Sequence, residues 1–184
     1  MRYQIFYQKG GNVNIDSLLE KMEQHKSLFN SLFGEDNWVF TGSAAVVIYA
    51  LKYVPEMVNI LDEPGDLDFL VKSRDLLTNK SIGDYNVRKQ ESLERSYTFS
   101  NSTTNESIDV MSVPVLKKLD INGFPLLDIS LLLDEYTDVL SGVRDKDIKK
   151  VEILQQISSQ VERPEVEDTR DVSHLDGIKR GALF

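Results

Sequence analysis

The stretch that decides the fold is WVFTGSAAVVIYALKY, residues 38–53. Its first four residues are typical of a short buried strand, and residues 44–53 are typical of a largely apolar helix that ends before Pro55. Between them, Gly42 and Ser43 form a turn at which phosphate oxygens can approach free backbone N–H groups and the positive end of the helix dipole. The same pair also fits a simple helix cap, because serine is a favoured N-cap residue. The stretch therefore predicts a strand–turn–helix unit with Gly42 and Ser43 as candidate nucleotide-binding residues.

Three aspartates stand near the predicted strands that follow. Asp66 and Asp68 lie at the start of a strand predicted for residues 67–71, and Asp109 lies in a strand predicted for residues 107–113. Side chains alternate along a strand, so Asp66 and Asp68 are expected on one side, where Asp109 could join them from a neighbouring strand. Each aspartate alone also fits an ordinary turn or exposed strand position. Together they predict a site for a hard divalent cation.

The composition limits which metal such a site could hold. The chain has 184 residues, 41% hydrophobic and 28% charged, as expected for a globular protein with its own core. It contains no cysteine, so any metal must be bound by oxygen atoms or by the two histidines. Oxygen ligands favour Mg²⁺ or Mn²⁺ over zinc.

Charge and hydropathy set expectations for partners and location. The formal charge of -9 disfavours broad nonspecific attraction to nucleic acid, because such binding needs Lys and Arg to neutralise phosphates. The first residues lack the apolar core of a signal peptide, and no segment reaches the ~18 apolar residues of a membrane span. We therefore expect a cytoplasmic protein, with the nucleus as the alternative compartment, and no membrane contact.

The remaining segments complete the predicted domain. A first strand, a helix capped by Asn14 or Asp16 and ended by Gly34, a loop with two prolines and a hairpin are expected before Asp109, and mainly helices after it. The ranges are 1–7 for the strand, 55–64 for the loop, 85–99 for the hairpin, and 115–119, 130–140 and 145–159 for the helices. We expect one domain over residues 1–160 and a mobile tail over residues 161–184.

The order of these elements resembles the nucleotidyltransferase superfamily related to DNA polymerase β, particularly its small, minimal members. That pattern is a strand, a Gly-Ser or Gly-Gly turn, a helix, an Asp-x-Asp strand start and a third Asp on a later strand. The matching residues are Gly42, Ser43, Asp66, Asp68 and Asp109. The similarity extends to residues 144–147, Arg-Asp-Lys-Asp, which look like an Arg-x-Lys-Asp helix entrance in many small members. Two departures are a long interval before Asp66, which suggests an inserted loop, and a preceding helix without the lysine of several toxin relatives.

The resemblance implies an α+β fold, a short mixed sheet with helices packed against it. It implies an enzyme that moves a nucleoside monophosphate from ATP or another NTP to an acceptor hydroxyl and releases pyrophosphate. Mg²⁺ or Mn²⁺ would be held by Asp66, Asp68 and Asp109, which would also be the catalytic residues. The acceptor is expected to be a small molecule or a protein rather than a long nucleic acid, with a tRNA end still open. A partner protein could supply acceptor recognition.

Other functions compete with this one. The same fold could be a catalytically inactive module that binds a nucleotide or another protein. Sugar transferases also use an Asp-x-Asp, but they begin with a nucleotide-binding parallel sheet that is not evident here. Haloacid-dehalogenase phosphatases carry Thr or Val two residues after the second Asp, where this chain has Leu70.

Overall fold

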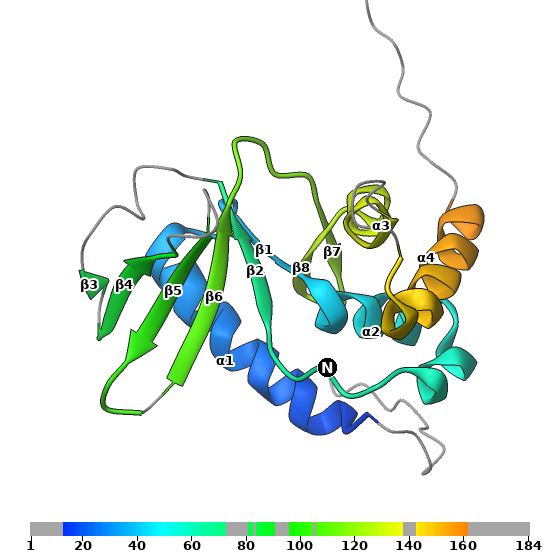
Figure 1. Ribbon diagram of the computed structural model, residues 1–184, viewed down its shortest axis with the longest axis horizontal. Coiled ribbons are helices and arrows are strands. Elements are labelled where there is room, and N and C mark those ends of the chain that lie inside the picture. The colour runs from blue at the N-terminus through cyan, green and yellow to red at the C-terminus, as the bar shows by residue number, and fades with distance from the viewer. Residues whose placement is uncertain are drawn as a thin grey trace, which may run out of the picture.

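The computed structural model describes residues 13–72, 81–82, 84–90, 96–104, 106–137 and 143–161 (Figure 1). Within this part of the chain the elements follow in this order: α1 (Ile15–Phe33), β1 (Trp38–Thr41), α2 (Gly42–Tyr53), η1 (Pro55–Ile60), β2 (Asp68–Val71), β3 (Ser81–Ile82), β4 (Tyr85–Lys89), β5 (Ser96–Asn101), β6 (Glu106–Ser112), β7 (Lys118–Ile121), β8 (Phe124–Leu127), α3 (Ile129–Thr137), η3 (Asp145–Asp147) and α4 (Ile148–Gln160).

The described strands form one mixed sheet in the order β3-β4-β5-β6-β2-β1-β8-β7. The pairs β1–β8 and β2–β6 are parallel, and the other neighbouring pairs are antiparallel. Helix α1 lies behind the sheet, while α2, α3 and α4 gather at the β8 side (Figure 1). This arrangement confirms the α+β fold class with a mixed sheet and helices packed against it.

Helix α1 packs on an aromatic face of the central strands. The Phe29 ring stacks on the Phe69 ring of β2 with the ring centroids 4.1 Å apart, and its centroid lies 5.2 Å from that of Trp38 in β1. Both ends of the helix have the predicted caps: Asn14 accepts a hydrogen bond from the backbone N–H of Ser17, and Gly34 follows the last turn. Because side chains alternate, Phe69 faces α1 while Asp68 faces the opposite side of the sheet.

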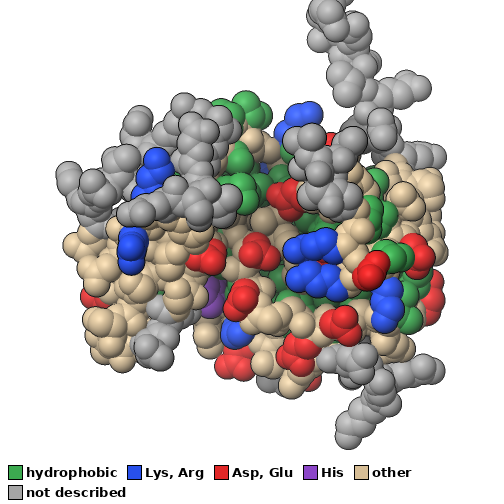
Figure 2. All heavy atoms as spheres, in the orientation of Figure 1, with side chains coloured by type: hydrophobic (Ala, Val, Ile, Leu, Met, Phe, Trp, Pro, Cys, Tyr) green, Lys and Arg blue, Asp and Glu red, His purple; other side chains and the backbone are tan. Residues whose placement is uncertain are grey.

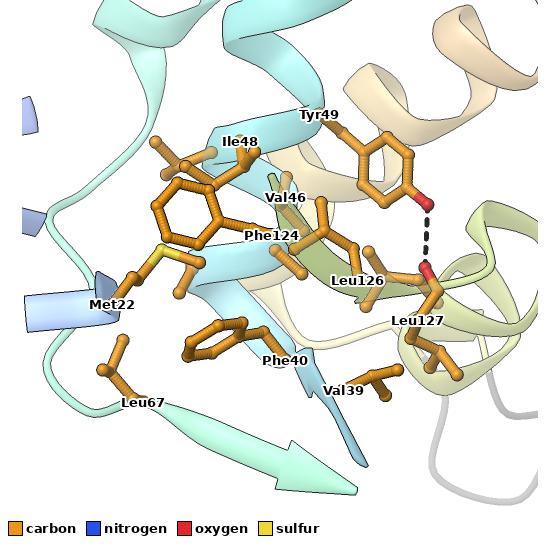
Figure 3. Packing of buried hydrophobic residues seen from close by; sticks show 14 of the residues in the cluster. Met22, Val39, Phe40, Val46, Ile48, Tyr49, Leu67, Phe124, Leu126 and Leu127 are labelled. Carbon is orange, nitrogen blue, oxygen red and sulfur yellow. Dashed lines mark hydrogen bonds between the residues drawn. The ribbon is translucent and has the colours of Figure 1, made fainter. Parts of the chain in front are cut away.

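Helix α2 is buried almost throughout, as its apolar sequence predicts. Residues 44–51 are all buried. Figure 3 shows this packing, in which Val46 and Ile48 lie against side chains of β1 and β8. The one polar group of Tyr49 is satisfied, because its hydroxyl donates to the backbone oxygen of Leu127 at 2.8 Å. The rigid helix fixes the turn that precedes it.

The chain between β6 and α3 differs from the expectation. The short helix expected at residues 115–119 is wrong, since β7 and β8 form an antiparallel hairpin there. Asn122 and Gly123 turn this hairpin with φ angles of 56° and 82°. An Asn-Gly turn between apolar residues is a strong hairpin signal, and it outweighs the helical spacing that predicted a helix.

The other boundaries agree with the structure to within a few residues. The expected loop at residues 55–64 instead begins with the short helix η1. The first strand expected at residues 1–7 and the tail beyond Val161 lie outside the described residues. In the part of the chain that the structure describes, no helix has both the length and the apolar character needed to span a membrane.

Candidate functional site

A row of polar side chains crosses one face of the central strands. Thr41 of β1 pairs with Asp68 of β2, and Thr98 of β5 pairs with Asp109 of β6. Phe69 pairs with Val110 in the parallel pair β2–β6, so the preceding residues Asp68 and Asp109 also stand side by side. Residues in register project to the same face of a sheet. The sheet therefore brings Asp68 and Asp109 together, as the sequence predicts.

Asp66 reaches the site in another way. It lies in the loop before β2 and not in the strand, so the expected strand alternation does not place it. It nevertheless borders the same pocket as Asp68 and acts on the charge of that residue. The loop therefore brings the third predicted carboxylate to the site.

Gly42, the first residue of the Gly42-Ser43 turn, lies directly against the side chain of Asp68. Its φ angle is 63°, in the left-handed region that favours glycine. A Cβ atom at Gly42 would overlap the Asp68 carboxylate and lie 2.9 Å from its Cγ. Glycine is needed here for two reasons, the backbone conformation and the space that Asp68 occupies.

The Asp68 carboxylate is in a setting that disfavours its charge. Partial burial raises the pKa of Asp68, because it removes water from the charged form. The negative charges of Asp66 and Asp109 raise this pKa further, and the positive charge of Lys150 lowers it in part. The side chain is still open to the pocket, and it makes no hydrogen bond or ion pair with any described residue. A bound cation would relieve this repulsion.

Asp109 contacts two polar neighbours on the β5 side of its strand. Its Oδ1 atom accepts hydrogen bonds from the Thr98 hydroxyl at 2.9 Å and from Nε2 of Gln90 at 3.1 Å. With Asp109 in this position, no three His, Asp or Glu side chains of the described chain form a set that could hold a metal ion. Carboxylate oxygens are donors of the kind that Mg²⁺ and Mn²⁺ prefer, but joint coordination would require these carboxylates to draw closer.

Helix α3 contributes two groups that the sequence did not reveal. The Thr41 hydroxyl donates to Oε2 of Glu135 at 2.6 Å, which places a further carboxylate beside Asp68. Burial raises the pKa of Glu135, the Thr41 hydrogen bond lowers it, and the nearby Asp68 adds a smaller upward effect. The Tyr136 side chain is hydrogen-bonded to Ser43, and burial raises the pKa of Tyr136 to about 12. The Gly42-Ser43 turn is thus braced by α3.

Three basic side chains lie where α4 begins and are called the basic group here: Arg144, Lys146 and Lys150. Asp147 is 2% exposed and binds Nζ of Lys150 at 2.9 Å and Nε of Arg144 at 2.5 Å. Burial acts to raise the pKa of Asp147, but the hydrogen bonds from Lys150 and Arg144 outweigh it and hold the pKa below its ordinary value. The Lys150 ammonium also lies 5.2 Å from the ring centre of Tyr136.

These groups border one pocket of about 1090 Å³. Figure 2 shows acidic side chains near the middle of this face, with Lys and Arg side chains beside them. The lining includes the turn, the Asp66–Asp68 segment, α3 and the basic group: Gly42, Ser43, Asp66, Asp68, Glu135, Tyr136, Arg144, Lys146 and Lys150. The pocket therefore has carboxylates and the positively charged side chains of Lys and Arg in one cavity, an arrangement suited to a metal-bound polyphosphate.

A smaller hollow of about 250 Å³ shares Asp66 and Asp68 with this pocket. Asp109 lines the smaller hollow, together with Lys21 and His25 of α1. The buried side of α1 includes His25, and the His25 ring lies 5.6 Å from that of Phe69. Asp68 thus stands between two cavities, one with the basic group and one with Asp109.

Other sequence interpretations have mixed outcomes. Arg144 and Lys146, two residues of the segment that resembles an Arg-x-Lys-Asp helix entrance, line the pocket. Glu135, Tyr136 and Lys150 were not identified, and only Lys150 had a local signal, its position three residues after Asp147 on the first turn of a predicted helix.

Comparisons with known proteins bear on the fold. A scan against protein-family models and a search of curated proteins found no match. Among solved structures, the chain is similar to the crystal structure of the Megavirus polyadenylate synthase, with a TM-score of 0.54 and 14% sequence identity. The match covers 89% of this chain and 41% of that one, so this chain spans less than half the length of the viral protein. The likeness indicates a nucleotidyltransferase-like fold.

Proposed function

We propose that this chain is a metal-dependent nucleotidyltransferase that moves a nucleoside monophosphate from an NTP, such as ATP, to an acceptor hydroxyl. The observation that carries the proposal is the row of Asp68 and Asp109 on adjacent parallel strands, next to the Gly42-Ser43 turn. The viral neighbour supports it at the level of fold, since that protein is named as a polyadenylate synthase.

The basic end of the pocket would bind the phosphates that leave. Lys150 is fixed by Asp147 and by the Tyr136 ring, so its ammonium is held at the pocket wall. Arg144 shares Asp147 and lines the same wall. Ser43 lies at the start of α2, where the backbone N–H groups and the helix dipole favour an anion. These groups would neutralise the charge of the departing pyrophosphate.

The carboxylates would hold the cation. Asp66, Asp68 and Asp109 supply oxygen donors of the type that Mg²⁺ and Mn²⁺ prefer. When bound, the ion neutralises phosphate charge and lowers the pKa of an attached hydroxyl. Asp66 and Asp68 border both cavities, so these two carboxylates are suited to touch both the nucleotide and the acceptor side.

The acceptor would enter from the smaller hollow. The hydroxyl oxygen of the acceptor would attack the α-phosphorus of the NTP. The bond from that phosphorus to the oxygen shared with the β-phosphorus would break, and pyrophosphate would leave on the opposite side. Asp109 lines that hollow and would take the hydroxyl proton. The basic group lines the large pocket instead, so attacking and leaving oxygens would lie on different sides of Asp68.

Pyrophosphate release tests the proposal. The purified chain is incubated with each NTP and Mg²⁺ or Mn²⁺, and with a panel of hydroxyl acceptors that includes small molecules, proteins and tRNA. We expect metal-dependent release in the parent and a loss of at least about 100-fold in Asp68→Asn and Asp109→Asn. Asp62→Asn, which removes an exposed charge outside both cavities, is the control.

The alternative is a module of the same fold that binds a nucleotide or a protein without turnover. It predicts equal nucleotide affinity in Asp109→Asn and the parent, and no pyrophosphate release with any acceptor. Isothermal titration with ATP and Mg²⁺, together with the pyrophosphate assay on the same variants, separates the two functions. An enzyme needs Asp109 for turnover, whereas the module tolerates its loss.

A further inference from the structure

Thr98 and Gln90 form a closed hydrogen-bond set with Asp109. Nε2 of Gln90 lies 3.0 Å from Oγ1 of Thr98 and 3.1 Å from Oδ1 of Asp109, and Thr98 Oγ1 lies 2.9 Å from the same carboxylate oxygen. All three side chains therefore meet at one oxygen. None of the roles described above uses Thr98 or Gln90.

The chemistry of the donors fixes the direction of each bond. An amide nitrogen only donates, so Gln90 Nε2 donates to both Thr98 and Asp109. The Thr98 oxygen thus accepts from Gln90, and its own hydrogen is directed to Asp109. Oδ1 of Asp109 therefore accepts two hydrogen bonds, one from Thr98 and one from Gln90.

Strand pairing holds the two partners in place. Thr98 stands opposite Asp109 in the antiparallel pair β5–β6. The Gln90 backbone N–H donates to the Ser96 oxygen at 2.9 Å, which continues the ladder beyond the end of β4. Because both partners are anchored through the backbone, they restrain the rotamer of Asp109. Its Oδ2 atom has no partner among the described residues.

We propose that Thr98 and Gln90 are positioning residues, which hold Asp109 oriented so that Oδ2 is the oxygen available to a divalent cation. This inference rests on the proposed function, because it assumes that Asp109 contacts the cation. Groups that hydrogen-bond to a metal ligand orient it, and their removal lowers metal affinity by about 10- to 100-fold. The metal affinity of this site thus depends on the hydrogen bonds that Thr98 and Gln90 donate to Asp109.

Mn²⁺ binding to the nucleotide-free protein provides the test. Free Mn²⁺ is measured by electron paramagnetic resonance during a titration of the full chain. Thr98→Val keeps the shape of the side chain but removes the hydroxyl, and Gln90→Met removes the amide. Thr98→Ser restores the hydroxyl, and Ser100→Ala removes a hydroxyl from the same strand and face without touching Asp109.

We expect Thr98→Val and Gln90→Met each to raise the Kd for Mn²⁺ by about 10-fold. We expect Thr98→Ser and Ser100→Ala to stay within about 2-fold of the parent. Circular dichroism melting of each variant shows whether a change in Kd accompanies a change in folding. Rescue by Thr98→Ser would not occur if the threonine acted only through its methyl group.

Two results would overturn the inference while leaving the proposed function intact. If the parent binds Mn²⁺ through Asp109 and Thr98→Val has the same Kd, the hydrogen bonds do not position the carboxylate. If Thr98→Val and Gln90→Met bind Mn²⁺ more tightly, the set withholds Asp109 from the cation instead of presenting it. If the parent and Asp109→Asn both fail to bind Mn²⁺, the metal site itself is wrong and the inference falls with it.

Discussion

Gly42 is the residue at which the fold and the site constrain each other most closely. We expect Gly42→Ala to lower the free energy of unfolding by more than the ~1–2 kcal/mol that a left-handed backbone costs an L-residue, because the new Cβ would also displace Asp68. Urea denaturation measures the loss. Gly65→Ala is the control, since a Cβ there meets no atom within 4 Å and Gly65 has no positive φ. Equal losses in the two variants would show that neither the backbone conformation nor the contact with Asp68 requires glycine at position 42.

The raised pKa of Asp68 predicts a pH-dependent cost of folding. Its carboxyl binds a proton more tightly in the folded than in the unfolded chain, so stability falls as the pH rises above the ordinary pKa of 3.8 and through the raised value. Asp68→Asn lacks this loss. We therefore expect the variant to melt above the parent at about pH 7 and the difference to shrink toward about pH 3.

Differential scanning calorimetry across this pH range measures that difference, with Asp62→Asn as the control for removing a surface charge. An excess stability of Asp68→Asn that grew toward acid pH would contradict a raised pKa for Asp68. A gain at neutral pH together with lost nucleotide affinity would mark Asp68 as a group that weakens the fold in order to serve the site.

Among the elements, the hairpin of β7 and β8 tests the cost of backbone conformation alone. Gly123 has a φ angle of 82°, and the nearest atom to an added Cβ is Nζ of Lys26 at 3.9 Å. Without a clash, Gly123→Ala should lose only the ~1–2 kcal/mol of the left-handed conformation. Urea denaturation beside Gly42→Ala checks this, and a larger loss at Gly123 than at Gly42 would be inconsistent with it.

The start of α4 depends on a covered ion pair. Asp147 is 2% exposed, but it lies near the molecular surface, where long side chains cover it, and the side chain of Arg144 is 62% exposed. We expect Asp147→Asn to cost about 2 kcal/mol, less than the ~3–5 kcal/mol of breaking a deeply buried pair. The loss should fade at acid pH, because the lowered pKa of Asp147 gives stability that disappears as the carboxylate is protonated.

Chemical denaturation of Asp147→Asn at neutral and acid pH, with Asp145→Asn as the control, measures this effect. Asp145 is an exposed neighbour that makes no side-chain ion pair with a described residue. A similar loss in both variants would show that removing a charge from the first turn of the helix matters more than the pair.

At the scale of the whole molecule, ligand binding should raise the melting temperature. A ligand at 100 times its Kd adds about 2.7 kcal/mol to the free energy of unfolding. We expect a shift with at least one NTP that requires Mg²⁺ or Mn²⁺ in the parent and is absent in Asp68→Asn. Differential scanning fluorimetry measures it for each nucleotide with and without metal. A melting-temperature shift of equal size in Asp68→Asn would show that the Asp68 carboxylate takes no part in nucleotide binding.

Local sequence was sufficient for most elements of the fold. The caps at Asn14 and Gly34 and the buried strand at residues 38–41 appear where the sequence predicts them, because helix ends and apolar runs depend on neighbouring residues. The helix expected at residues 115–119 is wrong, because pairing with β8 is stronger than local periodicity.

The sequence by itself determined the α+β class, the Gly42-Ser43 turn, and the presence of Asp68 and Asp109 on predicted strands. Spacing within one element locates the turn and the aspartates, and the order of the elements carries the resemblance that implies the fold class. Only the tertiary structure decided that these aspartates stand in one row, that Glu135 and Lys150 join them, and that Thr98 and Gln90 hold Asp109. The reason is physical: sheet register and helix packing bring together residues far apart in the chain, and no local pattern specifies those contacts.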